Sequence, residues 1–136
     1  MRPPSRQRLE AYWRGVVLVP ERELFIGLVD GSVAGSVQLV KPSPNFEAVR
    51  FNSDIETHFV APWGRGHGLA RHLLEAAEHA AIEDGFSVMR LDVRATQERA
   101  MSLYESCGYE RWGTLDRYHK VNDEMIAGHF YVKTLT

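Results

Sequence analysis

The chain has 136 residues, a formal net charge of −2, 44% hydrophobic residues and 25% charged residues. These values are typical of one soluble globular domain that can bury a core. The small net charge argues against a nucleic-acid partner, and no run of about 18 apolar residues predicts a membrane span. The single cysteine, Cys107, excludes an internal disulfide. With no apolar leader near the start, we expect a cytoplasmic protein that binds neither membranes nor nucleic acid.

The N-terminal third predicts one helix followed by a pair of strands. Apolar residues recur at helical spacing from Arg6 to Leu18, which predicts a helix there. Residues 23–40, ELFIGLVDGSVAGSVQLV, read as two strands joined at Asp30-Gly31, a typical hairpin turn. The prolines and asparagine of residues 41–46 predict a loop.

The remaining chain alternates strands and helices. The predicted elements are a strand at 49–60, a helix from Leu69 to Gly85, a strand at 87–93, a helix from Gln97 to Cys107, and strands at 110–114 and 129–135, the last preceded by a turn-rich segment at 120–128. The order α-β-β-β-α-β-α-β-β describes a single α/β domain over residues 1–136 with a mixed sheet. An exposed edge of that sheet would favour a homodimer.

The stretch VAPWGRGHGLARHLL, residues 60–74, joins a predicted strand to a predicted helix through three glycines. Backbone N–H groups at a helix start, together with the helix dipole, bind anions such as phosphate. Gly66 and Gly68 would allow close approach, while Arg65 and Arg71 add positive charge. Glycine-rich turns also occur without any ligand, so the motif alone leaves an ordinary turn open.

A family resemblance strengthens the phosphate interpretation. Residues 65–70, Arg-Gly-His-Gly-Leu-Ala, match Arg/Gln-x-x-Gly-x-Gly/Ala, the acyl-CoA motif of the GNAT superfamily of N-acetyltransferases. Residues 93–109, VRATQERAMSLYESCGY, resemble the second block of that family, a short helix with Ala-x-x-Leu-Tyr followed by Gly-Phe/Tyr. The resemblance implies a mostly antiparallel sheet flanked by helices. Against that pattern we expect the usual first strand and helix to be missing here, which would make the domain N-terminally short.

The resemblance also implies a function and a set of site residues. It implies direct transfer of an acetyl group from acetyl-CoA to a primary amine of a small molecule or peptide, with Tyr104 as the acid that protonates the departing thiolate. An ordinary phenol has a pKa near 10 and can serve in that role. Tyr104 also lies on the apolar face of its helix, where it could simply pack. The residues implied to contact the cofactor are His58, Phe59, Val60, Arg65, Gly66, His67, Gly68, Leu69, Ala70, Arg71, Gln97 and Tyr104.

The amine must lose a proton before it attacks, and a carboxylate can accept that proton. Asp54 and Glu56 are two residues apart, so they share one face of their strand, and the family places bases at about these positions. We favour Glu56 over Asp54. Six histidines are present without a metal-binding motif, so no metal is expected. Cys107 is interpreted as a small packing residue at a helix end.

Three alternatives remain open from the sequence. A looser likeness to tabtoxin-resistance-type acetyltransferases, in VQLV and FYVKTL, suggests a small amine without naming one. The short N-terminus and Gln97, where many relatives carry asparagine, are compatible with a non-catalytic acyl-CoA-binding or sensing module. An unrelated phosphate-binding domain would rest on the glycine motif alone.

Overall fold

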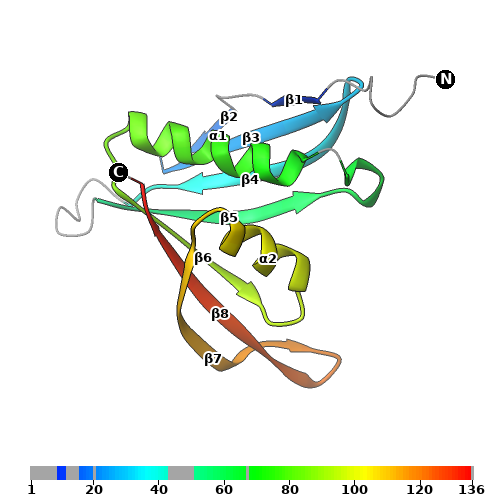
Figure 1. Cartoon of the computed structure of the whole chain (residues 1–136), viewed down its shortest axis with the longest axis vertical. Coiled ribbons are helices and arrows are strands. Elements are labelled where there is room, and N and C mark those ends of the chain that lie inside the picture. The colour runs from blue at the N-terminus through cyan, green and yellow to red at the C-terminus, as the bar shows by residue number, and fades with distance from the viewer. Residues whose placement is uncertain (1–8, 12–15, 20, 43–50, 67, 136) are drawn as a thin grey trace.

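The computed structural model describes residues 9–11, 16–19, 21–42, 51–66 and 68–135. Within these residues the chain forms a mixed eight-stranded sheet with two α-helices (Figure 1). The elements are β1 (Leu9–Ala11), β2 (Val16–Val19), β3 (Arg22–Val29), β4 (Ser32–Val40), β5 (Asn52–Val60), a 3₁₀ turn η3 (Pro62–Gly64), α1 (Leu69–Glu83), β6 (Val88–Arg94), α2 (Glu98–Ser106), β7 (Glu110–Val121) and β8 (Glu124–Thr134). Neither described helix combines the length and apolar character that crossing a membrane requires.

The sheet order is β1-β3-β4-β5-β6-β8-β7, and β2 also pairs with β3. Every pairing is antiparallel except that of β5 with β6. This matches the predicted α/β class with a mixed, mostly antiparallel sheet flanked by helices. Within the described residues the outer edge of β7 has no partner strand, so a homodimer stays a prediction.

The predicted helix from Arg6 to Leu18 is wrong where the structure describes that segment. Leu9–Ala11 and Val16–Val19 are strands that pair with β3, and the rest of the segment lies outside the described residues. The run Val-Val-Leu-Val contains three β-branched residues, which favour extended backbone and pack well in a sheet. Pairing with the edge of β3 therefore overrode a helical spacing that extended over fewer than four turns.

The turns of the β3–β4 and β7–β8 hairpins form at residues that accept left-handed backbone. Asp30 and Gly31 have φ angles of 51° and 82°, which confirms the predicted turn between β3 and β4. Asn122 and Asp123, with φ of 51° and 63°, make the same kind of turn between β7 and β8. The predicted turn-rich segment 120–128 is therefore mostly strand, and both C-terminal strands are longer than predicted.

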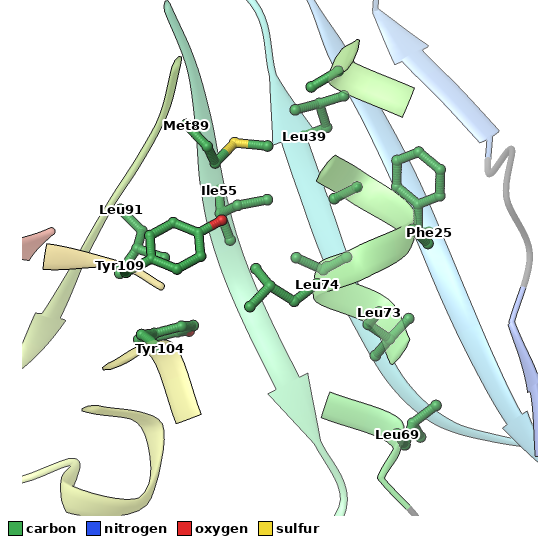
Figure 2. Close-up of a cluster of buried hydrophobic side chains, with 14 of the residues drawn as sticks. Phe25, Leu39, Ile55, Leu69, Leu73, Leu74, Met89, Leu91, Tyr104 and Tyr109 are labelled. Atoms are coloured by element: carbon green, nitrogen blue, oxygen red, sulfur yellow. The ribbon is translucent and has the colours of Figure 1, made fainter. Parts of the chain in front are cut away.

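The core lies between α1 and the face of β3, β4 and β5 that it covers (Figures 1 and 2). Leu69, Leu73 and Leu74 on one side of α1 are at most 2% exposed, and they belong to one buried cluster with Phe25 and Leu39 from the strands. Burying a leucine of this kind stabilises the fold by about 2 kcal/mol. This packing holds the first turns of α1 against Gly27 of β3 and against Gly35 of β4, which pairs with Val60 at the end of β5.

Strands β5 and β6 are paired over a short length only. Their parallel register covers Asn52–Asp54 of β5 and Val88–Arg90 of β6. Beyond that point the two strands diverge, and α2 lies across the opening between them (Figure 1). The sheet is thus open at its middle, next to the start of α1.

We expect Gly35→Ala in β4 to destabilise the protein by about 2 kcal/mol, because the β4–β5 contact leaves no room for a methyl group. A Cβ at Gly35 would lie 2.6 Å from the Phe59 carbonyl oxygen and 3.2 Å from a Leu73 methyl carbon. Urea unfolding measures the loss. Gly113→Ala is the matched control, since no atom lies within 4 Å of its Cβ position. Equal midpoints for the two variants would contradict the tight contact.

Candidate active site

A cleft of about 380 Å³ opens between the end of β5, the start of α1 and α2, and we call it the helix-side cleft. It is lined by His58, Phe59, Val60, Gly64, Arg65, Gly66, Gly68, Leu69, Ala70, Arg71, Gln97, Arg99, Ala100, Leu103 and Tyr104. The structure therefore brings together every residue predicted to contact the cofactor except His67, which lies outside the described residues.

A second cleft of about 980 Å³ opens on the strand side of the same gap, and we call it the strand-side cleft. Its walls come from β5, β6 and β7 and include Glu56, Asp92, Arg94, Tyr118 and His119. The two clefts meet at shared residues, which are His58, Phe59, Arg65, Gln97, Ala100 and Tyr104. A molecule in one cleft can thus reach a molecule in the other beside the Tyr104 hydroxyl.

The start of α1 has the features of an anion site. Gly66 and Gly68 have φ of 88° and 73°, backbone that disfavours any side chain, and Gly68 is the N-cap residue. No side chain caps this helix, and its first turn contains no acidic residue. The first N–H groups of the 15-residue helix therefore face the helix-side cleft with the positive end of the dipole uncompensated.

Arginines add positive charge around this helix start. Arg65, Arg71 and Arg99 all line the helix-side cleft. The Arg71 guanidinium also donates hydrogen bonds to Ser106 Oγ at 2.9 Å and Cys107 Sγ at 3.2 Å, which ties α1 to α2. Cys107 is thus a partly buried neighbour of the cleft and packs against the core, in line with the structural role expected of it.

A bulge in β5 turns the strand into the cleft. The register with β4 shifts between Ser36 and Gln38, and Thr57 has φ of 49°. Positive φ is rare for a β-branched residue, so this conformation is strained and is held by the surrounding pairing. After the bulge the edge of β5 that faces β6 has no ladder partner, which leaves backbone N–H and C=O groups available along His58 to Val60.

His58 and Tyr104 meet at the bottom of the gap. The His58 ring lies 2.9 Å from the Tyr104 hydroxyl through Nδ1 and 2.9 Å from the Ala70 carbonyl oxygen through Nε2. A carbonyl oxygen only accepts, so Nε2 carries the hydrogen and the neutral ring accepts the phenol hydrogen at Nδ1. This chain of hydrogen bonds joins β5, the first turn of α1 and α2.

Burial sets the protonation of this pair. It lowers the pKa of His58 to about 4, against a smaller opposing effect of the Ala70 hydrogen bond. It also raises the pKa of Tyr104 to about 12, with a further contribution from the negative charge of Asp92. At neutral pH the imidazole is therefore uncharged and the phenol keeps its proton.

The two carboxylates predicted as bases are both held by arginines. Asp54 accepts two hydrogen bonds from Arg90, at 2.9 and 3.1 Å, and does not line either of the two clefts. Glu56 lines the strand-side cleft, but its carboxylate lies 3.0 Å from the Arg22 guanidinium. Accepting a proton would break an ion pair in either case.

The sequence interpretation missed Asp92, which lines the strand-side cleft beside Tyr104. Its carboxylate accepts a hydrogen bond from the Tyr118 hydroxyl and has no cationic partner among the described residues. Aspartate is depleted in strands, so an exposed aspartate in the middle of β6 was a signal that could have been followed. No group of three or more potential metal ligands occurs among the described residues.

We expect stability to fall as the pH drops from about 6.5 to about 4. Over that range the unfolded chain protonates His58 while the folded chain does not, and one pKa unit is worth about 1.4 kcal/mol. The loss from this residue is at most about 3 kcal/mol. His58→Gln should show a shallower dependence of unfolding free energy on pH. Histidine NMR signals should place the His58 titration near pH 4, and a titration near 6.5 would contradict the buried, neutral ring.

Comparison with known proteins agrees with this geometry. Residues 2–109 match the model of the Acetyltransferase (GNAT) family. The chain is 55% identical over 100 residues to an uncharacterized N-acetyltransferase encoded in the hisH-hisA intergenic region of Azospirillum brasilense, a match that covers 74% of this chain and 60% of the relative. The chain thus spans less than two thirds of that relative.

Solved structures share the fold. An N-acetyltransferase from Staphylococcus aureus Mu50 superposes with a TM-score of 0.76 at 23% identity, over 85% of this chain and 68% of that one. The acetyltransferase yncA from Salmonella typhimurium, solved with its cofactor acetyl-CoA, has a TM-score of 0.75 at 19% identity, over 85% of this chain and 65% of that one. With the family model matching most of its length, the chain belongs to the GNAT acetyltransferase family.

Proposed function

We propose that the protein transfers an acetyl group from acetyl-CoA directly to a primary amine of a small molecule or peptide. The observation that carries this proposal is the opening between β5 and β6, where an uncapped helix start, a free strand edge and Tyr104 come together at two adjoining clefts. Membership of the GNAT family and the acetyl-CoA bound to the Salmonella relative support the same donor.

The helix-side cleft would bind the donor. The pyrophosphate would accept hydrogen bonds from the first N–H groups of α1, with Arg65 and Arg71 supplying charge. The amide groups of the pantetheine arm would pair with the free edge of β5 from His58 to Val60. The arm would then lead the thioester through the gap to Tyr104, and Gln97 would lie beside it.

The chemistry would proceed by direct attack. The ammonium of the acceptor gives one proton to a carboxylate, directly or through water, and the free amine forms a bond to the thioester carbonyl carbon. The carbon–sulfur bond then breaks, the nitrogen loses its second proton, and the sulfur gains one. Atoms and charge balance with one proton released for each acetyl group transferred.

Tyr104 would stabilise the departing sulfur. Because the pKa of Tyr104 is raised to about 12, its hydroxyl is protonated at neutral pH and available as a donor. A thiol of ordinary acidity has a pKa near 8.5, so a complete transfer from this phenol would be uphill. We therefore expect Tyr104 to donate a strong hydrogen bond as the thiolate forms, with its hydrogen turning from His58 to the sulfur.

Tyr104→Phe should lower kcat about 100-fold and leave the affinity for acetyl-CoA within about twofold, since the ring stays and only the donor is lost. The assay is release of free thiol from acetyl-CoA with a panel of primary amines, combined with calorimetric binding of acetyl-CoA. Unchanged turnover in this variant would remove the role of Tyr104. Wild-type protein that binds acetyl-CoA but acetylates no amine would support the non-catalytic acyl-CoA-binding module, and absence of binding would overturn the donor itself.

Asp92 is the proposed proton acceptor, in place of the Glu56 and Asp54 favoured from sequence. We expect Asp92→Asn to lower kcat/KM about 100-fold near pH 7, with recovery at higher pH as more of the amine is already neutral. Glu56→Gln, the matched variant of a carboxylate held by Arg22, should cost only a few-fold. A larger loss in Glu56→Gln than in Asp92→Asn, measured from pH–rate profiles, would return the role to Glu56.

A further inference from the structure

We propose that the acceptor carries an anionic group, a carboxylate or a phosphonate-like group, close to its amine, and that Arg94 binds this group while Asp92 receives the amine. The inference rests on the proposed acetyl transfer and names the class of acceptor. The acceptor would then be zwitterionic, as in a free amino acid, rather than a simple monoamine or polyamine.

The first support is the balance of charge around the strand-side cleft. Two carboxylates near this cleft are already matched, because Arg90 holds Asp54 and Arg22 holds Glu56. Three charged side chains of the strand-side cleft, Arg65, Asp92 and Arg94, have no charged partner within the part of the chain that the structure describes, and of these only Asp92 and Arg94 lie next to each other on one strand, β6. Asp92 has only the neutral Tyr118 hydroxyl as a partner, and the Arg94 guanidinium has neither an ion pair nor a hydrogen bond.

The second support is position. Asp92 and Arg94 are two residues apart on β6, on the face opposite the buried Leu91 and Val93, and both line the strand-side cleft. Successive residues on one face of a strand are separated by roughly 6.6 Å. A single small molecule can therefore contact both side chains, and the two make no ion pair with each other that would cancel their charges.

The third support is the rigidity of the site. The β6–β8 ladder pairs Asp92 with Phe130 and Arg94 with Gly128. The Tyr118 ring lies directly over Gly128, where a Cβ would be 2.2 Å from the ring, and its hydroxyl bonds Asp92. Burial and the neighbouring Asp92 raise the pKa of Tyr118, and the positive charge of Arg94 opposes this rise. Arg94 is therefore close to the Tyr118 hydroxyl. Tyr118 thus lies beside both charged groups.

Arg94 is separate from the arginines of the donor side. Arg71 and Arg99 line the helix-side cleft alone, and Arg65 lines both clefts, whereas Arg94 lines only the strand-side cleft. A half-buried guanidinium without a counter-ion favours an anionic ligand, and its planar fork suits a carboxylate or phosphonate bidentately. A volume of about 980 Å³ leaves room for a small acceptor there.

The test compares acceptors that differ only in the anionic group. Amino acids are paired with their amides, such as glycine with glycinamide, and aminomethylphosphonate tests the alternative anion. For the wild type we expect kcat/KM to be at least tenfold higher for the anionic member of a pair. Arg94→Gln should lower kcat/KM at least tenfold for the anionic acceptors and less than twofold for the amides, with the KM for acetyl-CoA unchanged. For the anionic acceptors, Arg94→Lys should give a kcat/KM between those of the wild type and of Arg94→Gln, because lysine keeps the positive charge but lacks the planar guanidinium.

Arg99→Gln is the matched control from the helix-side cleft, and it should alter the KM for acetyl-CoA while leaving the ratio between acid and amide as in the wild type. Equal losses for acids and amides in Arg94→Gln, a raised KM for acetyl-CoA in that variant, or a wild type that prefers amides would each overturn the inference. Calorimetric measurement of the binding of the same acids and amides, with CoA present, separates the proposed acceptor class from the proposed acetyl transfer. Binding of acids that Arg94→Gln abolishes supports the acceptor class even if no acetyl group moves, and absence of acid binding to the wild type rejects it.

Discussion

The site depends on one limit in the sheet, which is that β5 and β6 stay paired over only three residues of each strand. The double hydrogen bond between Asp54 and Arg90 lies at the last of these pairs and clamps the strands where they begin to separate. Past this point β5 stays paired with β4, apart from the bulge at Thr57, and β6 stays paired with β8. The gap leaves the edge of β5 that faces β6 unpaired.

Buried aromatic side chains pack beside the opening between β5 and β6. Tyr104 from α2 is 5% exposed and packs edge-on against Tyr109, with Tyr131 on the other side. The buried Glu78 of α1 accepts hydrogen bonds from Tyr109 at 2.7 Å and Lys133 at 3.1 Å, which joins the two halves of the sheet behind the gap. Breaking a satisfied, buried network of this kind is costly, so the shape of the cleft belongs to the native fold.

The two sides of the gap use different kinds of recognition. The helix side presents backbone N–H groups and the helix dipole, which suit the phosphates and amides of a common donor. The strand side presents the side chains of Asp92, Arg94 and Tyr118, so recognition there depends on side-chain identity rather than on backbone groups.

Much of the fold, and the gathering of the proposed donor-binding residues in one cleft, could be predicted from the sequence, because those signals are local. Glycines at Gly66 and Gly68, the following amphipathic helix and the Tyr104 block all act within short segments, and the structure brings them to one cleft. The N-terminal segment was predicted wrongly because the pairing of β1 and β2 with β3 is a tertiary contact that overrides local spacing.

The acceptor half was decided by tertiary structure. Spacing correctly placed Asp54 and Glu56 on one face of a strand, but the arginines that hold them come from β6 and β3, far along the chain. Asp92 became a site residue only because β5 and β6 separate beside it and the β7 bulge carries Tyr118 over Gly128. Sequence by itself determined the β3–β4 turn, the two helices and the glycine-rich start of α1 where the donor phosphates are proposed to bind, since these follow from neighbouring residues. Which charges stay unmatched at the gap depended on long-range pairing, and only the folded chain decided it.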